Sequence, residues 1–267
     1  MKKIKNLIYS ALVVLSLSIF GAWAPLGVAS TETRYADAQF YSLYARETIT
    51  FDNKEMDAKT NFAPQYTIIS GLTNACGAVA GTEVIGYYDK YYPNMIPNWE
   101  SFYAASGKYR LQDQVYIPSV MTDLYTLMNT NVGGAGVSES DFVNGLKKYI
   151  TGKGYGVNMQ NVGGATIDFS ACKTAINNNK VIALLSDATD VYNLTEGATQ
   201  DTVNSITISD AHIMIASGYK EVKYYKSGSL FRTDRYLVVS SGSQSLGLVY
   251  YKINNPKLDS AYIVNII

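Results

Sequence analysis

The chain has 267 residues, of which 47% are hydrophobic and 16% are charged, as in an ordinary globular protein with one large domain or two small ones. Its formal net charge is zero and becomes −3 without residues 1–30, which carry three lysines and no acidic residue. This charge argues against nucleic acid as a partner, because phosphate binding requires a clustered basic surface.

Residues 1–30 have the pattern of a secretory signal peptide of Gram-positive type. Three lysines precede an uncharged apolar run, 7–24, and small residues at 28–30 and 36–38 offer cleavage sites. A membrane anchor is the alternative, because residues 7–28 are nearly long enough to cross a bilayer. We expect removal of this segment and a secreted, extracellular protein without stable membrane association.

Residues 31–63 contain one short alternating run, 48–51, followed by a polar stretch. The segment is either a short pro-segment that covers a cleft or a first strand that completes a β-lobe. We favour the strand, because inhibitory pro-regions are generally longer.

Cys76 stands at the start of a predicted helix, 78–91, which ends before a proline. A cysteine attacks as the thiolate, and a helix N-terminus and a neighbouring imidazolium both lower the pKa of a thiol. Small residues at Gly77, Ala78 and Gly81 would let backbone from a second lobe approach the sulfur. The pattern is that of a nucleophile on the floor of a cleft.

The periodicity along the chain changes from helical to strand-like. Beyond residue 116 we expect three helices. The first spans 118–128, the second follows a capping box formed by Ser138 and Asp141, and the third spans 170–177. The helix after the capping box should bury Phe142, Leu146, Tyr149 and Ile150 on one face and end near Gly152. Strands are predicted at 155–162, 181–185, 209–216, 235–239, 248–253 and 261–266.

Four acidic residues follow the predicted strand 181–185, namely Asp187, Asp190, Glu196 and Asp201. We interpret this stretch as a solvated loop in preference to a weak calcium site. The order of elements, helices first and strands later, indicates an α+β fold.

His212 is the only histidine and follows Cys76 by 136 residues, within the separation of ~130–150 residues found in papain-like enzymes. As the catalytic base for a Cys76 nucleophile, its ring would remove the thiol proton and then protonate the leaving amine. A core histidine at the start of a strand is the alternative. One histidine makes a catalytic zinc site improbable, and we expect neither a metal nor a cofactor.

Five segments, taken in order, resemble papain-fold cysteine peptidases of secreted bacterial proteins, the branch related to bacteriocin leader peptidases: 74–80, 85–89, 141–149, 175–184 and 210–219. The resemblance implies a two-lobed papain-like domain over residues 64–267. Its helical lobe would carry the cysteine helix, and its antiparallel β-lobe the histidine. It also implies cleavage of a protein or peptide substrate through a Cys76 thioester.

Papain-like enzymes orient the imidazole with an Asn or Asp at the end of the next strand, where this chain has serines. Ser241 aligns best and Ser240 second, whereas Asn254 and Asn255 come later. A serine holds the ring less firmly than an amide or a carboxylate, so this position departs from the family pattern.

The resemblance implies an oxyanion hole formed by the Cys76 backbone N–H and an upstream side-chain donor. Gln65 resembles the donor glutamine of this branch, and Asn74 is the alternative. An exposed loop amide is an equally good interpretation of either residue.

Three alternatives to a peptidase site stay open. A secreted chain with two cysteines could pair them, so a Cys76–Cys172 disulfide competes with a reactive thiol. Against the disulfide, Cys172 shares a predicted helical face with Ala175 and Ile176, which suits a buried thiol. The other functions are a peptidoglycan-peptide amidase of the same fold and an inactive, disulfide-stapled domain that binds peptide or glycan.

Overall fold

The computed structural model describes residues 36–39, 47–50, 53–60, 69, 71–96, 116–164, 166–195, 202–242, 246, 248–253 and 258–267. The chain divides into two units, Met1–Thr31 and Glu32–Ile267, and every described residue belongs to the second. The predicted signal peptide, 1–30, therefore lies outside the described residues. None of the helices in the described ranges is long and apolar enough to cross a membrane.

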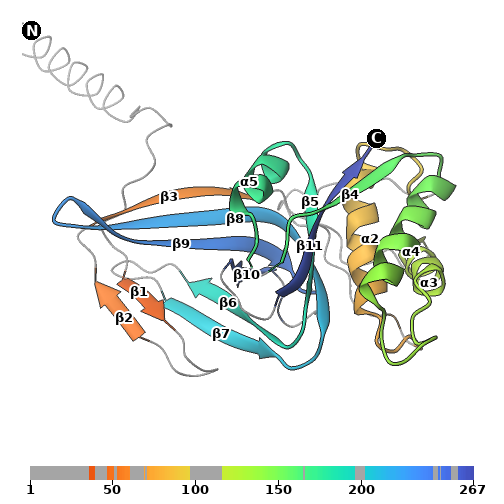
Figure 1. The fold of residues 1–267 in the computed structure, drawn as a ribbon, viewed down its shortest axis with the longest axis horizontal. Helices are drawn as coiled ribbons and strands as arrows, with labels where there is room; N and C mark the ends of the chain where they lie inside the picture. Colours follow the sequence, from red (N-terminus) through yellow and green to blue (C-terminus); the bar gives the residue numbers. More distant parts are fainter. Residues whose placement is uncertain are drawn as a thin grey trace, which may run out of the picture. The chain divides into compact units, whose positions relative to one another are not determined.

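The described part of the chain is an α+β structure in which helices are mixed with antiparallel strands (Figure 1). The helices are α2 (Cys76–Asp89), α3 (Tyr116–Leu127), α4 (Glu139–Gly152) and α5 (Phe169–Asn177). The strands are β1 (Ala36–Gln39), β2 (Glu47–Thr50), β3 (Asn53–Thr60), β4 (Val157–Asn161), β5 (Val181–Ser186), β6 (Thr189–Thr195), β7 (Thr202–Ile208), β8 (His212–Lys226), β9 (Ser229–Ser240), β10 (Leu248–Lys252) and β11 (Leu258–Ile266).

Nine of these strands form one antiparallel sheet in the order β4-β11-β5-β8-β9-β10-β6-β7, with β3 also paired to β8. The long strand β8 has β9 along one edge. On its other edge β5 pairs with residues 212–216 and β3 with residues 218–225. Strands β8 and β9 are joined by Ser227 and Gly228, whose φ angles of 49° and 75° are those of a tight hairpin turn.

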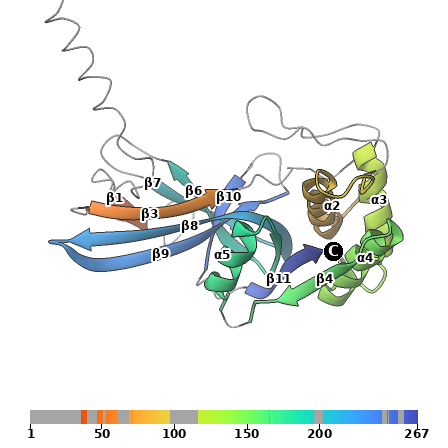
Figure 2. The ribbon, with the colours of Figure 1, turned by 90° about the horizontal axis from the view of Figure 1, so that it is seen from above.

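Helices cover both faces of this sheet around β5 and β8, because alternate residues of a strand point to opposite faces. Val181, Ala183 and Leu185 of β5 belong to the apolar cluster formed with α2, α3 and α4. Ile182 and Leu184 belong to the cluster that contains α5. In Figure 2, α2, α3 and α4 lie together and α5 lies apart from them. All six residues of β5 are buried.

The two cysteines lie in different clusters on opposite faces of the sheet. Cys76 packs against the cluster of α2, α3 and α4, whereas Cys172 of α5 is fully buried in the other. Both thiols are free. The alternative Cys76–Cys172 disulfide is therefore wrong, because the sheet separates the two side chains.

The helix predictions agree with the structure to within a few residues. Helix α2 begins at Cys76 and ends at Asp89, two residues earlier than expected at each end. The capping box is confirmed, since the Ser138 Oγ accepts a hydrogen bond from the Asp141 N–H at 3.1 Å and donates one to its carboxylate at 2.6 Å. The predicted apolar face of α4 is buried.

One prediction was wrong. The stretch from Asp187 to Asp201 was expected to be a solvated loop, but its residues 189–195 form β6, which pairs with β7. Thr207 of β7 donates a hydrogen bond to Asp190 across the two strands at 2.7 Å. In the N-terminal segment, the alternating run forms β2, which pairs with β1 in a separate two-stranded sheet. The polar stretch after it forms β3 and joins the sheet at β8.

Candidate active site

Cys76 is the first residue of α2, and Ala75 before it has no polar side chain to cap the helix. The N–H groups of the first turn therefore lack partners within the helix and point toward the space around the thiol. Burial raises the pKa of the Cys76 thiol, and hydrogen bonds from the backbone at Ile213 and Gly77 lower it by less. The expectation of a lowered pKa was wrong, because desolvation of the thiol outweighs these hydrogen bonds.

The small residues after Cys76 accommodate side chains and not, as expected, backbone from a second lobe. A Cβ on Gly77 would lie 2.6 Å from Cγ1 of Val137, and one on Gly81 would lie 2.9 Å from Cε of Met128. These glycines thus allow α3 and the loop before α4 to pack tightly on the start of α2.

His212 opens β8, is half-buried, and makes a short hydrogen bond through Nε2 to the backbone carbonyl oxygen of Ser241, at 2.6 Å. A carbonyl oxygen can only accept, so Nε2 carries the hydrogen. In the neutral ring Nδ1 then has the lone pair and can act as a base. This hydrogen bond therefore fixes the tautomer of His212 and holds the Nε2 side of its ring in place.

Ser241 lies beside His212, as expected, but the group that contacts the ring is its backbone carbonyl oxygen. It directly follows β9, the strand that neighbours β8. The hydroxyl of Ser240 points elsewhere and donates a hydrogen bond to the carboxylate of Glu83 at 2.6 Å. Asn254 and Asn255, the later candidates, lie outside the described residues.

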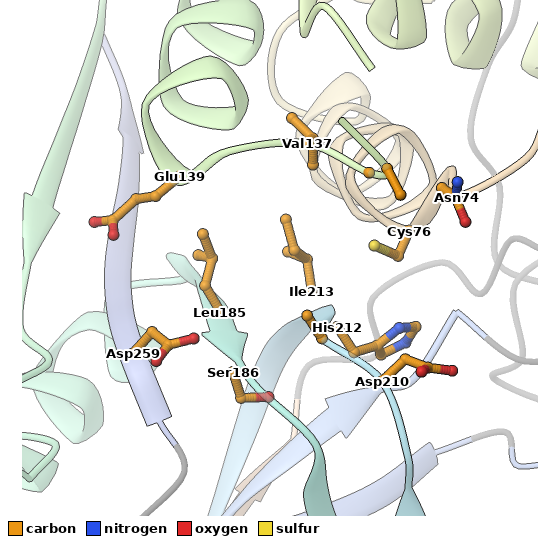
Figure 3. Close-up of a pocket in the computed structure, with 13 residues that line it drawn as sticks. Asn74, Cys76, Val137, Glu139, Leu185, Ser186, Asp210, His212, Ile213 and Asp259 are labelled. Carbon is orange, nitrogen blue, oxygen red and sulfur yellow. The ribbon is translucent and has the colours of Figure 1, made fainter. Parts of the chain in front are cut away.

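Cys76 and His212 line the same pocket, whose volume is about 460 Å³. Figure 3 shows their side chains on one side of it and the carboxylates of Glu139 and Asp259 on the other. Leu185 and Ile213 lie between these two sides (Figure 3). The pocket thus exposes a thiol and an imidazole to the same small volume.

Asn74 also lines this pocket, with a left-handed backbone (φ 52°). Its Nδ2 donates a hydrogen bond to Oδ1 of Asn131 at 3.0 Å, and the same oxygen accepts from the Gly136 N–H at 2.8 Å. Asn131 in turn donates to the Thr73 carbonyl at 3.1 Å. Asn131 therefore ties the loop before α4 to the residues that precede Cys76, a role that no sequence pattern indicated.

The two oxyanion candidates differ in what the structure describes of them. An amide nitrogen has two hydrogens, so Asn74 keeps one donor besides its bond to Asn131. Gln65 lies outside the described residues. Within the described ranges, no three His, Cys, Asp or Glu side chains are grouped to hold a metal ion.

No family model, curated protein or solved structure matches this chain. The chemistry of the pocket is therefore what indicates a function.

Proposed function

We propose that this chain is a secreted cysteine peptidase that hydrolyses peptide bonds through a Cys76 thioester. The observation that carries the proposal is the hydrogen bond from His212 Nε2 to the Ser241 carbonyl, in a pocket that His212 shares with Cys76. A nucleophile, a base and a group that orients the base are the parts that acyl transfer requires.

In the proposed reaction Sγ of Cys76 attacks the carbonyl carbon of the scissile peptide while Nδ1 of His212 takes the thiol proton. Because burial raises the pKa of the thiol, the proton moves as attack proceeds and not from a thiolate formed beforehand. The Cys76 backbone N–H and the Asn74 amide are the proposed donors to the oxyanion.

His212 then gives its proton to the leaving amine, and the C–N bond breaks to leave a thioester. Water attacks this thioester with His212 as base, which releases the acid product and restores the thiol. No metal or cofactor takes part in the proposed cycle.

Three features support a two-lobed, papain-like domain over residues 64–267. A helix begins at the proposed nucleophile, the sheet is antiparallel, and the histidine lies at the start of a strand. Secretion after removal of residues 1–30 is part of the same proposal. An amidase acting on peptidoglycan peptides would use the same groups, so the choice of substrates must cover both.

The test is turnover of unfolded proteins, peptide libraries and peptidoglycan peptides by the wild type and by three variants. We expect no turnover by Cys76→Ala and a loss of ~10²–10⁴-fold in kcat/KM for His212→Ala. Cys172→Ala is the matched control and should retain activity, because this thiol lies on the far side of the sheet. Full-rate turnover by Cys76→Ala, or no cleavage of any substrate by the wild type, would overturn the proposal.

A further inference from the structure

Glu83 is a fully buried acidic residue on the same helix as Cys76, and the proposed reaction does not use it directly. Burial of a carboxyl group is costly unless hydrogen bonds replace its water. The Ser240 hydroxyl supplies one such bond at 2.6 Å, between residues 157 positions apart in the chain. An apolar side chain of similar volume would bring no such cost, so the residue calls for an explanation other than stability.

The position of Glu83 on α2 suggests that explanation. Cys76, Val79 and Glu83 are spaced by three and four residues and therefore lie along one face of the helix. Glu83 contacts Ser240. Val79 faces Gly242 so closely that a Cβ on this glycine would lie 3.1 Å from Cγ1 of Val79.

Helix α2 thus contacts the chain on both sides of Ser241. This residue's carbonyl oxygen holds Nε2 of His212 at 2.6 Å. Ser240 and Ser241 are both fully buried, which leaves the carbonyl little room to turn. The element that carries the nucleophile therefore also fixes the group that orients the base.

We propose that Glu83 is a positioning residue that, through Ser240, holds the Ser241 carbonyl against His212 and so sets the tautomer and direction of the imidazole. This inference deepens the proposed function, on which its catalytic meaning rests. Loss of the Glu83–Ser240 bond frees the carbonyl, and the ring then exchanges between tautomers and orientations.

His212 is the only histidine of the chain, so its ring nitrogens can be observed by ¹⁵N NMR without assignment. We compare wild type, Ser240→Ala, Glu83→Leu and Glu83→Gln, which keeps an oxygen that accepts the serine hydrogen. Thr82→Val is the matched control, because Thr82 is also fully buried on α2 and its hydroxyl donates a hydrogen bond to the Ala78 carbonyl within its own helix.

We expect the Nε2–H tautomer in wild type, Glu83→Gln and Thr82→Val, and a mixture in Ser240→Ala and Glu83→Leu. The rate of Cys76 alkylation near neutral pH and the kcat for peptides should fall ~10–100-fold in these two variants, with KM little changed. Ser240→Ala removes a single oxygen, so it decides the test even if Glu83→Leu does not fold.

A wild-type tautomer and wild-type rates in Ser240→Ala would overturn the inference, as would an equal loss in Thr82→Val. Failure of the proposed function is distinguishable. In that case the wild type shows no turnover, while the NMR spectra still report whether Glu83 and Ser240 set the ring.

Discussion

The two thiols of this chain differ in their exposure and in what surrounds them, since Cys76 is half-buried and Cys172 is fully buried. Burial raises the pKa of both, but only Cys76 has backbone N–H groups and an imidazole near its sulfur. Cys172 lies in an apolar cluster with Ala175 and Ile176. The contrast supports the proposed role of Cys76 as the nucleophile and a packing role for Cys172.

Burial, with a smaller effect of the Asp168 charge, raises the pKa of Cys172 to about 12. The folded state therefore favours the protonated thiol. This contribution to stability is fully present below the pKa of a free thiol and is lost as the pH rises toward 12. Between pH 8 and 10.5 the free energy of unfolding should fall by about 2 kcal/mol more in wild type than in Cys172→Ala.

Urea unfolding of both proteins at the two pH values, under reducing conditions, measures this difference. Equal losses in wild type and variant would show that the Cys172 thiol is not desolvated as described.

The chemistry of their side chains indicated Cys76 and His212, whereas the region of Ser241 was indicated by the resemblance to papain-like enzymes. That the Ser241 carbonyl and not its hydroxyl meets the ring was not predictable, because every residue has a carbonyl. Glu83 was missed for another reason. Its burial depends on contact with Ser240, which is remote in the sequence.

At the scale of elements, the contact between α2 and the end of β9 controls the site. Gly242 has φ +67°, and a Cβ there would lie 3.1 Å from Cγ1 of Val79. Gly242→Ala should therefore lower the free energy of unfolding by about 1–2 kcal/mol and slow Cys76 alkylation, because the Ser241 carbonyl shifts.

Gly152→Ala at the end of α4 is the control, since nothing lies within 4 Å of a Cβ at that position and its φ is not positive. Urea unfolding and alkylation rates are measured for both variants. An unchanged alkylation rate in Gly242→Ala would show that the contact between α2 and Gly242 does not influence Cys76.

Elements with strong local signals were predictable, and those that depend on distant partners were not. The capping box at Ser138 and the apolar run of β5 are local patterns that the structure retains. Strand β3 and the outer halves of β8 and β9 are polar, and their pairing depends on contacts between strands. One example is the ion pair of Arg235 with Glu221, at 2.6 Å, between residues directly opposite each other.

At the scale of the molecule, the fold brings together two residues that are 136 positions apart in the chain. The start of α2 packs on the sheet beside the first residues of β8. These two elements line the pocket together with the loop before α4. Because α2 also contacts the end of β9, a movement of this helix would displace Cys76 and the Ser241 carbonyl together.

The proposed function depends above all on His212 acting as the base for Cys76. The decisive measurement is the rate of iodoacetamide labelling of Cys76 from pH 5 to 10, read by mass spectrometry in wild type and His212→Ala. In wild type we expect labelling at a lower pH than in His212→Ala, because the imidazole can accept the thiol proton. In His212→Ala the imidazole is gone and burial still raises the pKa of the thiol, so labelling should need a higher pH than in wild type. Identical pH profiles in the two proteins, or a Cys76 that stays unmodified throughout, would contradict the account.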